Sequence, residues 1–349
     1  MLDQAIHALA YAWGGPVTSG CLRRFPEDFQ VSEIPLLAPD GQGEHVWLRI
    51  RKRQQNTAWV ADRLAKLAGI SGRQVSYAGL KDRQAVTEQW FSVHLPGQPM
   101  PDWTALNDPA VEVISVARHS RKLRRGALQG NEFKIHVREV QGDRQALEQQ
   151  LAMVSKQGVP NYFGLQRFGS GGSNLQTAAA LFRSPQTRLS RQRRSLALSA
   201  ARSLLFNQVL SRRVADGTWN RAIDGDALQL QGSHSYFVAA AVDAGLMQRI
   251  AAQDVHPTGP LPGSGENPVL GECRQLEDAV LDGYREWQDG LAALRVKQDR
   301  RALRLVVGNL QWDWPAADEL LLTFTLPAGG YATSVLRELI TSNPDEAER

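Results

Sequence analysis

The sequence has little of what secreted, zinc-binding or membrane-spanning proteins depend on. It contains two cysteines, Cys21 and Cys273, which lie far apart with no partner at metal-ligand spacing, so neither a disulfide framework nor a cysteine-based zinc site is expected. No stretch approaches the roughly 18 to 20 apolar residues of a membrane span, and the first residues lack the basic segment that opens a secretion signal. We therefore expect a cytoplasmic protein that does not span a membrane.

Several common catalytic signatures are missing as well. The seven histidines are scattered, and no pair has ligand spacing or a Ser-His-Asp context, so neither a zinc hydrolase nor a serine hydrolase is favoured. The glycine-rich segment 158–174 lacks the Lys-Ser/Thr that ends a nucleotide-binding loop, which favours packing of its aromatic residues around tight turns. Asp224 and Asp226 could hold a divalent cation, although a surface turn is the commoner use of their Asp-Gly-Asp tripeptide.

What the chain does have is a globular composition and segregated positive charge. Its 349 residues, 42% hydrophobic and 22% charged, correspond to about two domains of the usual roughly 100 to 200 residues. The net charge of +4 is modest, but 183–213 holds eight arginines and no acid, and 118–138 holds seven basic residues and one glutamate. Such runs neutralise the phosphates of a nucleic acid, and a solvated helix face is the alternative interpretation.

Hydrophobic periodicity predicts strands near both ends of the chain and helices between them. The strands expected in the N-terminal part are 44–53, 73–77, 89–95, 111–117 and 132–140, with one helix from Asn56 to Leu67. The helices expected in the middle are 145–157, 173–181, 198–214 and 275–293, with short strands at 227–230 and 235–240 and an irregular Pro/Gly-rich loop at 256–268. The C-terminal part is expected to hold strands at 301–307 and 319–326 and a helix at 330–340 that begins near Thr333 or Ser334. This order predicts one α+β domain interrupted by an inserted domain.

The segment 77–89 (YAGLKDRQAVTEQ) is the first candidate for chemistry. It places Asp82 just after a strand, in a turn announced by Gly79 and flanked by Lys81 and Arg83. Flanking positive charge favours the ionised carboxylate, which could act as a nucleophile or a base. The alternative is an aspartate that caps a turn, and this segment alone leaves both open.

Eight segments, taken together and in order, carry a family resemblance. They are PEDF (26–29), AGLKDRQAVTEQW (78–90), RKLRRGALQGNEF (121–133), GVPNYFGLQRFGSGGSNL (158–175), LSAARSLLFNQVL (198–210), DGDALQL (224–230), LPGSG (261–265) and LPAGGYATSVLREL (326–339). A single segment such as DGD would mean little, but the eight in this order resemble the tRNA pseudouridine synthase D family over nearly the whole chain.

The resemblance implies an α+β, two-domain, V-shaped enzyme. Its pseudouridine synthase catalytic domain, with a mixed and largely antiparallel sheet, would comprise 1–155 and 300–349. The inserted α/β domain characteristic of the family would comprise 156–299. A monomer is expected, because the cleft must admit tRNA, and no obligate protein partner is evident.

The resemblance also implies site residues. Asp82 matches the catalytic aspartate, Lys81 the lysine beside it, and the pocket-lining residues match Phe29, Asn131 and Phe133. The family usually has phenylalanine at the position of Tyr331, so stacking on a base can persist, while the added hydroxyl could hydrogen-bond to substrate or aspartate. In other pseudouridine synthase families a tyrosine does occupy the pocket. The residues expected to grip RNA phosphates are Arg121, Arg124, Arg191, Arg193 and Arg194.

The implied reaction converts uridine to pseudouridine in tRNA, with the uridine at position 13 as the expected target, and needs no cofactor or metal. Whether Asp82 attacks C1′ or C6 or removes a proton at C2′ stays open. A non-catalytic RNA-binding protein or RNA-folding chaperone on the same scaffold is one alternative. A metal-dependent nuclease or nucleotidyltransferase built on Asp224 and Asp226 is another, and it would require a divalent cation.

Overall fold

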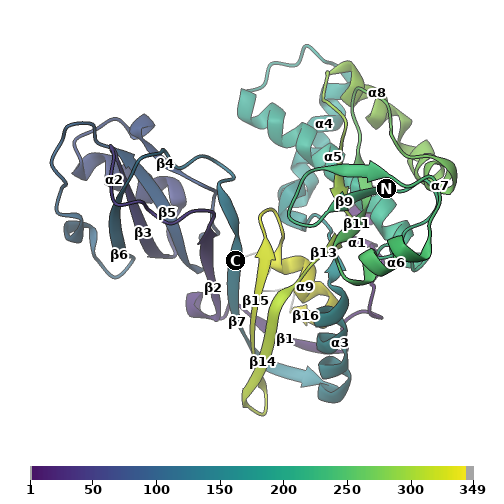
Figure 1. Cartoon of the computed structure of the whole chain (residues 1–349), viewed down its shortest axis with the longest axis horizontal. Helices are drawn as coiled ribbons and strands as arrows, with labels where there is room; N and C mark the ends of the chain where they lie inside the picture. The colour runs from purple at the N-terminus through teal and green to yellow at the C-terminus, as the bar shows by residue number, and fades with distance from the viewer. Residues whose placement is uncertain (1, 343–349) are drawn as a thin grey trace. The chain divides into compact units, whose positions relative to one another are not determined.

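The computed structural model describes residues 2–342 and divides into two compact units (Figure 1). Among the described residues, unit 1 comprises 2–16, 146–306 and 331–339, and unit 2 comprises 17–145, 307–330 and 340–342. The predicted assignment of a catalytic domain and an inserted domain stays a prediction, and its last residues, 343–349, lie outside the described part.

Unit 2 is built on a mixed sheet with the strand order β14-β15-β7-β2-β5-β3-β6, in which β1 pairs with β7 and β16, and β4 pairs with β5. Its strands are β1 (Thr18–Leu22), β2 (Phe29–Pro35), β3 (His45–Arg53), β4 (Val75–Tyr77), β5 (Val86–His94), β6 (Val111–His119), β7 (Leu128–Gly142), β14 (Gly308–Ala316), β15 (Glu319–Pro327) and β16 (Ile340–Ser342). The β1–β16 and β2–β5 pairs are parallel and the other pairs of this sheet are antiparallel. The predicted α+β class with a largely antiparallel sheet is confirmed.

The core of unit 2 follows from the alternation in β3. Val46, Leu48 and Ile50 are fully buried against helix α2 (Thr57–Leu67), which packs Val60 and Leu64 onto them. Each such side chain contributes about 1.5–3 kcal/mol when it is removed from water. Short 3-10 helices complete the unit, namely η1 (Pro26–Asp28), η2 (Gly72–Gln74) and η3 (Trp103–Leu106). The sheet is thereby covered by α2 on the side opposite the outward-facing arginines of β3.

Unit 1 is mainly helical. Its helices are α1 (Leu2–His7), α3 (Arg144–Gln157), α4 (Ser173–Arg183), α5 (Arg191–Ala215), α6 (Ala244–Ala251), α7 (Gly271–Leu281), α8 (Arg285–Ala293) and α9 (Ala332–Leu339), with η4 (Leu165–Phe168), η5 (Ser170–Gly172) and η6 (Asp282–Tyr284). Its strands are β8 (Val159–Pro160), β9 (Ala227–Leu230), β10 (Tyr236–Val238), β11 (Val255–Leu261), β12 (Asp299–Ala302) and β13 (Arg304–Leu305), which form an antiparallel sheet β10-β9-β11-β12 and the pair β13-β8. The long helix α5 lies at the centre, because its buried side chains belong to two hydrophobic clusters.

Three sequence predictions in unit 1 were wrong. The single helix expected at 275–293 is broken into α7 and α8 by η6, where Tyr284 leaves the helical region with φ of −123° and ψ of 24°. The strand expected at 301–307 is divided into β12 and β13. The loop expected at 256–268 begins as strand β11, although it contains Pro257 and Pro260.

The prolines fit in β11 because this strand changes partners. It pairs with β9 over Val255–Pro257 and with β12 over Thr258–Leu261. Each half therefore has an edge without a paired strand, where a proline costs no ladder hydrogen bond. Proline content alone could not show this, because the change of partners is a tertiary property.

Candidate active site

Asp82 lies in the loop 78–85 between β4 and β5, which we call the Asp82 loop. Its Oδ2 lies 3.0 Å from Nη2 of Arg23, and its Oδ1 accepts a hydrogen bond of 3.1 Å from the backbone N–H of Gln84. The side chain is 26% exposed. The carboxylate is therefore oriented by a cation and a main-chain donor, while part of its surface stays open to a reactant.

The cation that pairs with Asp82 is not one of its neighbours in the chain. Lys81 instead forms a buried ion pair of 2.7 Å with Glu33 of β2, and Arg83 is exposed. Arg23 follows β1 directly, has a left-handed backbone with φ of 61°, and places its guanidinium 4.1 Å from the ring centre of Phe29. The tertiary fold, rather than the Lys-Asp-Arg triplet, supplies the positive charge at the carboxylate.

Buried polar groups fix the main chain of the Asp82 loop. Lys52 donates from Nζ to the carbonyl oxygen of Asp82 at 2.9 Å. The backbone N–H of Lys81 donates to Thr57 Oγ1 at 3.1 Å, and that hydroxyl donates to Gln89 Oε1 at 2.9 Å. Lys52, Thr57 and Gln89 are buried, so these bonds have no competition from bulk water. The loop is thereby held as a rigid platform for the carboxylate.

Burial also changes the acid–base properties of Lys52. Desolvation lowers the pKa of Lys52 from 10.5 to about 8, although the negative charge of Asp82 acts in the opposite direction. The ammonium therefore sits close to its titration range under the Asp82 loop. A change of pH near 8 should therefore change the charge of Lys52 in the folded protein.

The predicted pocket residues share one face of the sheet. In the antiparallel β2–β7 pair, Val31 lies opposite Phe133 and Glu33 opposite Asn131. The rings of Phe29 and Phe133 meet edge to face at 6.3 Å, and both are largely buried. Phe29 contacts Arg23 and Glu33 contacts Lys81, so one chain of contacts links this face to the Asp82 loop.

Asn131 carries an unused acceptor on that face. Its Oδ1 is buried and has no hydrogen-bond partner among the residues that the structure describes. A buried carbonyl oxygen without a donor costs free energy of about 1–3 kcal/mol, which a ligand donor would recover. The amide is thus suited to accept a hydrogen bond from a bound base.

A pocket of about 450 Å³ flanks the same loop. It is lined by Gln54, Gln55, Arg83 and Gln84. This volume is within the range of small-ligand sites, and its lining offers amide groups and one cation. Two of the lining residues, Arg83 and Gln84, follow Asp82 in the loop, while Asp82 itself does not line the pocket.

Tyr331 belongs to unit 1, where it begins the turn into α9. Its hydroxyl accepts a hydrogen bond from Arg167, and its ring lies 6.3 Å from that of Phe163. The guanidinium of Arg301 stacks on Phe163 at 4.3 Å, and burial lowers the pKa of Arg301 to about 10. The predicted packing of the 158–174 aromatics is confirmed, because Tyr162 and Phe168 are buried in the core of this unit.

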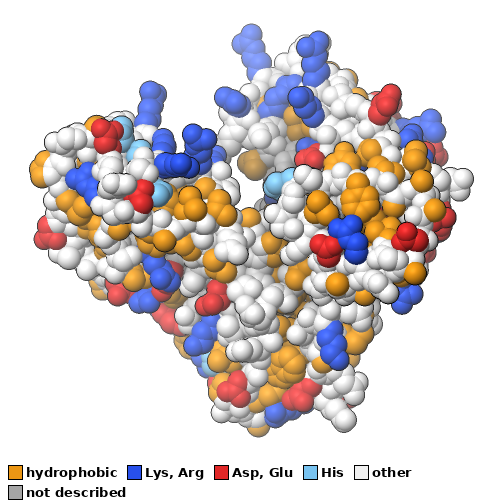
Figure 2. Space-filling model, viewed as in Figure 1, with side chains coloured by type: hydrophobic (Ala, Val, Ile, Leu, Met, Phe, Trp, Pro, Cys, Tyr) orange, Lys and Arg blue, Asp and Glu red, His pale blue; other side chains and the backbone are white. Residues whose placement is uncertain are grey.

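The predicted RNA-binding arginines lie on two exposed elements. Arg121 and Arg124 are exposed in the segment 120–127 between β6 and β7, which we call the basic loop. Figure 2 shows Lys and Arg side chains gathered on the β4 side of unit 2. The basic loop therefore offers positive charge at the surface of this unit.

The second basic element is the first turn of α5, which contains Arg191, Arg193 and Arg194. Its N-cap Ser190 accepts a hydrogen bond from the backbone N–H of Arg193. Cations at a helix N-terminus are disfavoured by the helix dipole, whereas an anion bound there is favoured. The three arginines therefore gain nothing from the helix dipole, and their role in binding phosphates stays a prediction.

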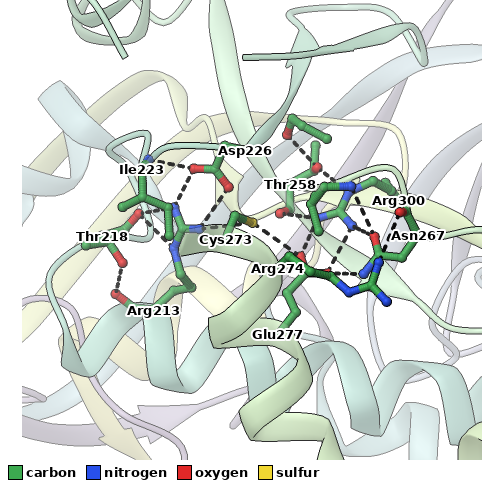
Figure 3. A network of polar contacts seen from close by, with 12 residues as sticks. Arg213, Thr218, Ile223, Asp226, Thr258, Asn267, Cys273, Arg274, Glu277 and Arg300 are labelled. Atoms are coloured by element: carbon green, nitrogen blue, oxygen red, sulfur yellow. Dashed lines mark hydrogen bonds and ion pairs between the residues drawn. The ribbon is translucent and has the colours of Figure 1, made fainter. Parts of the chain in front are cut away.

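The Asp-Gly-Asp tripeptide forms a turn in which Asp224 is exposed, as the turn interpretation predicts, but that interpretation is wrong in placing Asp226 at the surface. The side chain of Asp226 is fully buried, and both of its oxygens accept hydrogen bonds of 2.9 Å from Arg213 (Figure 3). It also accepts from the backbone N–H of Ile223, and Asp224 Oδ1 accepts from that of Val242. Within residues 2–342 no group of three or more potential ligands is placed to hold a metal ion. The two aspartates stabilise a turn.

Three residues of this site were missed from the sequence, namely Arg23, Glu33 and Lys52. Two of them carried a signal. Lys52 continues the buried face of Val46, Leu48 and Ile50, and Glu33 continues that of Phe29 and Val31. A charge on the apolar face of an alternating strand requires a partner. Arg23 had no such signal, because its position after β1 follows from pairing between distant segments.

Comparison with known proteins supplies the family. The model of the family described as "tRNA pseudouridine synthase D (TruD)" matches residues 5–181 and 173–339. A tRNA pseudouridine synthase D of Nitrosococcus oceani is 49% identical over 334 residues, covering 95% of this chain and 93% of its own. One of Methylococcus capsulatus is 48% identical over 336 residues, covering 96% and 95%.

A solved structure shares the fold. The crystal structure of a candidate tRNA pseudouridine synthase D from Methanosarcina mazei has a TM-score of 0.75, at 22% identity, and the match covers 99% of this chain and 98% of that one. Together with the two relatives, it confirms the resemblance inferred from the eight segments. The chain belongs to the tRNA pseudouridine synthase D family. Within residues 2–342, no helix combines the length and apolar character of a membrane span.

Proposed function

We propose that Asp82 is the carboxylate with which this protein converts uridine to pseudouridine in tRNA, and that the target is the uridine at position 13. The observation that carries the proposal is the oriented, partly exposed carboxylate of Asp82 on a loop that buried polar groups hold in place. Proximity and orientation of this kind can supply several kcal/mol of a reaction barrier. Family membership supports the reaction, and the loop geometry supports the choice of Asp82.

The reaction needs no redox partner, because it is an isomerisation. The bond from C1′ to N1 breaks, the uracil turns, and a bond forms from C1′ to C5, while the proton on C5 is lost and N1 gains one. An ionised carboxylate can serve as a nucleophile or as a base in such a sequence. Arg23 orients the carboxylate of Asp82, and Lys81, bound to Glu33, acts by positioning the loop rather than by touching the carboxylate.

The base must leave its stack to reach Asp82. The free Oδ1 of Asn131 can accept a hydrogen bond from the N3–H of uracil, while Phe29 and Phe133 provide an apolar surface. We assign Tyr331 to stacking on the flipped base, which is worth about 1–3 kcal/mol. The arginines of the basic loop and of α5 would bind phosphates of the tRNA, and we propose a monomer as the active form, working in the cytoplasm.

The decisive experiment incubates purified protein with tRNA in the presence of a chelator and detects pseudouridine at position 13 by its reactivity with carbodiimide. Wild-type protein is expected to form it. Asp82→Asn should lose at least about 10³-fold in rate while tRNA affinity stays within a few-fold, because an amide is nearly isosteric but carries no negative charge.

The matched control is Asp289→Asn, which changes an exposed aspartate of α8 in the same way. Near-normal activity of Asp82→Asn would refute the assignment of the carboxylate. A wild-type protein that binds tRNA but forms no pseudouridine would support the non-catalytic RNA-binding alternative. If wild-type protein is active without chelator but inactive in its presence, the metal-dependent alternative would be supported.

A further inference from the structure

Unit 2 has a second pocket, of about 530 Å³, apart from the one beside the Asp82 loop. Its walls are Ala58, Ala61 and Asp62 of α2, the strand Val75–Tyr77, and the segment 122–125 of the basic loop. The volume falls within the range of small-molecule sites and is large enough for one nucleotide. The residues assigned to the target base, Asp82 and Asn131 among them, do not line it.

The cationic wall of this pocket is fixed in position. Leu123 is buried in a cluster with Trp47 and Ala78, although residues on both sides of it are exposed. Trp47 donates from Nε1 to the carbonyl oxygen of Arg121 at 2.9 Å, and the N–H of Gly126 donates to the carbonyl of Ala78 at 2.8 Å. The basic loop therefore presents its cations from a rigid backbone, which lowers the entropy cost of binding.

Those cations outnumber the acidic residues at the pocket. Lys122, Arg124 and Arg125 are exposed, none of them forms an ion pair within the described part of the chain, and Asp62 is the acidic residue among those that line the pocket. In contrast, Arg49 and Arg51 on strand β3 are neutralised by two carboxylates, because both pair with Glu88 and Arg51 also pairs with Glu112. The positive charge at the pocket is therefore available to phosphate groups of a ligand.

The floor of the pocket is suited to a base. Ala58, Ala61 and Val75 are apolar, and the ring of Tyr77 is held edge to face against Phe91 at 5.9 Å. Val75 and Tyr77 point to the same face of β4, toward α2. A rigid ring beside an apolar wall is what stacking of a planar base requires.

We propose that this pocket binds one nucleotide of the RNA substrate other than the target uridine, with its phosphate on Lys122, Arg124 and Arg125 and its base against Tyr77. The proposal rests on the proposed function, because it takes tRNA as the substrate. Tyr77 precedes Asp82 by five residues, which limits the separation of their Cα atoms to about 18 Å. The bound nucleotide therefore lies close to the reacting one in space and would help to hold the flipped conformation of the RNA.

The test fills the pocket without removing a charge. Ala58→Phe places a ring in the pocket from an exposed position of α2, and Ala292→Phe, on an exposed position of α8, is the matched control. Affinity for full-length tRNA is measured by titration over a range of salt concentrations. Ala58→Phe should weaken binding about tenfold relative to the control, as expected when a stacked base is displaced.

Two further variants separate the base from the phosphate. Arg124→Ala with Arg125→Ala should flatten the salt dependence of binding, by about 0.7 to 0.9 in the logarithmic slope for each phosphate that is no longer neutralised, whereas Ala58→Phe should leave that slope unchanged. Binding by Ala58→Phe within twofold of the control would overturn the proposal. A loss of affinity confined to the arginine variants would reduce the site to a phosphate contact and overturn its base-binding part.

A measurement on wild-type protein keeps the proposal testable if Ala58→Phe does not fold. Ultraviolet cross-linking to tRNA should attach a nucleotide to the peptide containing Tyr77, and absence of that adduct counts against the pocket. The two proposals fail separately. If wild type forms no pseudouridine but Ala58→Phe still weakens tRNA binding, the proposed reaction is wrong and the pocket proposal stands. If wild type forms pseudouridine and Ala58→Phe binds tRNA normally, the proposed reaction stands and the pocket proposal is wrong.

Discussion

Asp82 in unit 2 and Asp226 in unit 1 are both paired with arginine, yet the two pairs have different properties. Asp226 and Arg213 are 0% and 1% exposed and make two hydrogen bonds to each other, whereas Asp82 and Arg23 are 26% and 24% exposed and meet through one oxygen. The first pair leaves no oxygen for a ligand. The second leaves part of the carboxylate accessible.

The difference shows what separates a structural carboxylate from one available for chemistry. At Asp226 the side chain itself is the anchor, and its hydrogen bonds tie Arg213 and Ile223 together. At Asp82 the main chain is anchored instead, by Lys52 below the loop and by Thr57 beside it. Buried groups therefore hold the loop while the carboxylate of Asp82 stays partly exposed.

The comparison predicts that substitution of the two aspartates changes the free energy of unfolding by very different amounts. Asp226→Asn leaves Arg213 as a buried, incompletely paired charge and should lower the free energy of unfolding by about 3–5 kcal/mol. Asp82→Asn should change it by less than about 1 kcal/mol, because its ion pair is partly exposed. Denaturant titration of both variants measures this, and equal losses would remove the distinction between the two aspartates.

The anchoring of the loop is tested at Lys52. Lys52→Met deprives the Asp82 carbonyl of its donor and should reduce kcat by about 10²-fold through misplacement of the carboxylate, with little change in KM. Lys66→Met, an exposed position of α2, is the control. Unchanged kcat in Lys52→Met would mean that the loop keeps its position without the buried amine.

The same residue predicts a pH dependence of stability. With a folded-state pKa of about 8 against an ordinary 10.5, Lys52 is deprotonated in the folded chain but protonated in the unfolded chain between these values. The stability of wild type relative to Lys52→Met should therefore rise with pH from about 8 to 10, by up to about 1.4 kcal/mol per unit. Denaturant titrations of both proteins across this pH range measure the sign of the change. A stability difference that does not vary with pH would contradict burial as the cause of the lowered pKa of Lys52.

A smaller effect, at Tyr331, tests whether unit 1 contributes to catalysis as well as to stability. Tyr331→Ala should lower turnover about tenfold by removing the stacking ring, whereas Tyr331→Phe should cost little. The structure adds that the hydroxyl accepts from Arg167, so Tyr331→Phe also releases that guanidinium. If Tyr331→Phe is as damaging as Tyr331→Ala, in turnover measured with saturating tRNA, the Arg167 contact is the working feature of this residue.

The smallest effect is expected at the start of α5. Arg191→Glu combined with Arg193→Glu should flatten the salt dependence of tRNA binding, by about 0.7 to 0.9 in slope for each phosphate that the variant no longer binds. Isomerisation of bound tRNA should change less than affinity. Lys66→Glu, on α2, is the control. If the slope for the double variant is unchanged, the first turn of α5 is a solvated helix face that does not bind phosphates.

Local patterns predicted much of this fold because they depend on neighbours in the chain. The alternation of β3 and the helical spacing of α2 are local, and both elements were found where the sequence places them. Strands β1, β2 and β14 were not predicted, since each is short or irregular and is stabilised by pairing with segments far away in the chain. The start of α9 at Ala332, one or two residues before the predicted Thr333 or Ser334, is an ordinary boundary error.

By itself, the sequence determined the α+β class, the family and Asp82 as the candidate carboxylate, because these follow from periodicity and from motifs that are contiguous in the chain. Only the tertiary structure decided which cation meets Asp82, that Lys81 pairs with Glu33, and that Asp226 is a buried structural residue. The physical reason is that an ion pair forms between groups that are near in space. Charges next to each other in the sequence can point in different directions from a loop, and each then meets a partner from a distant part of the chain.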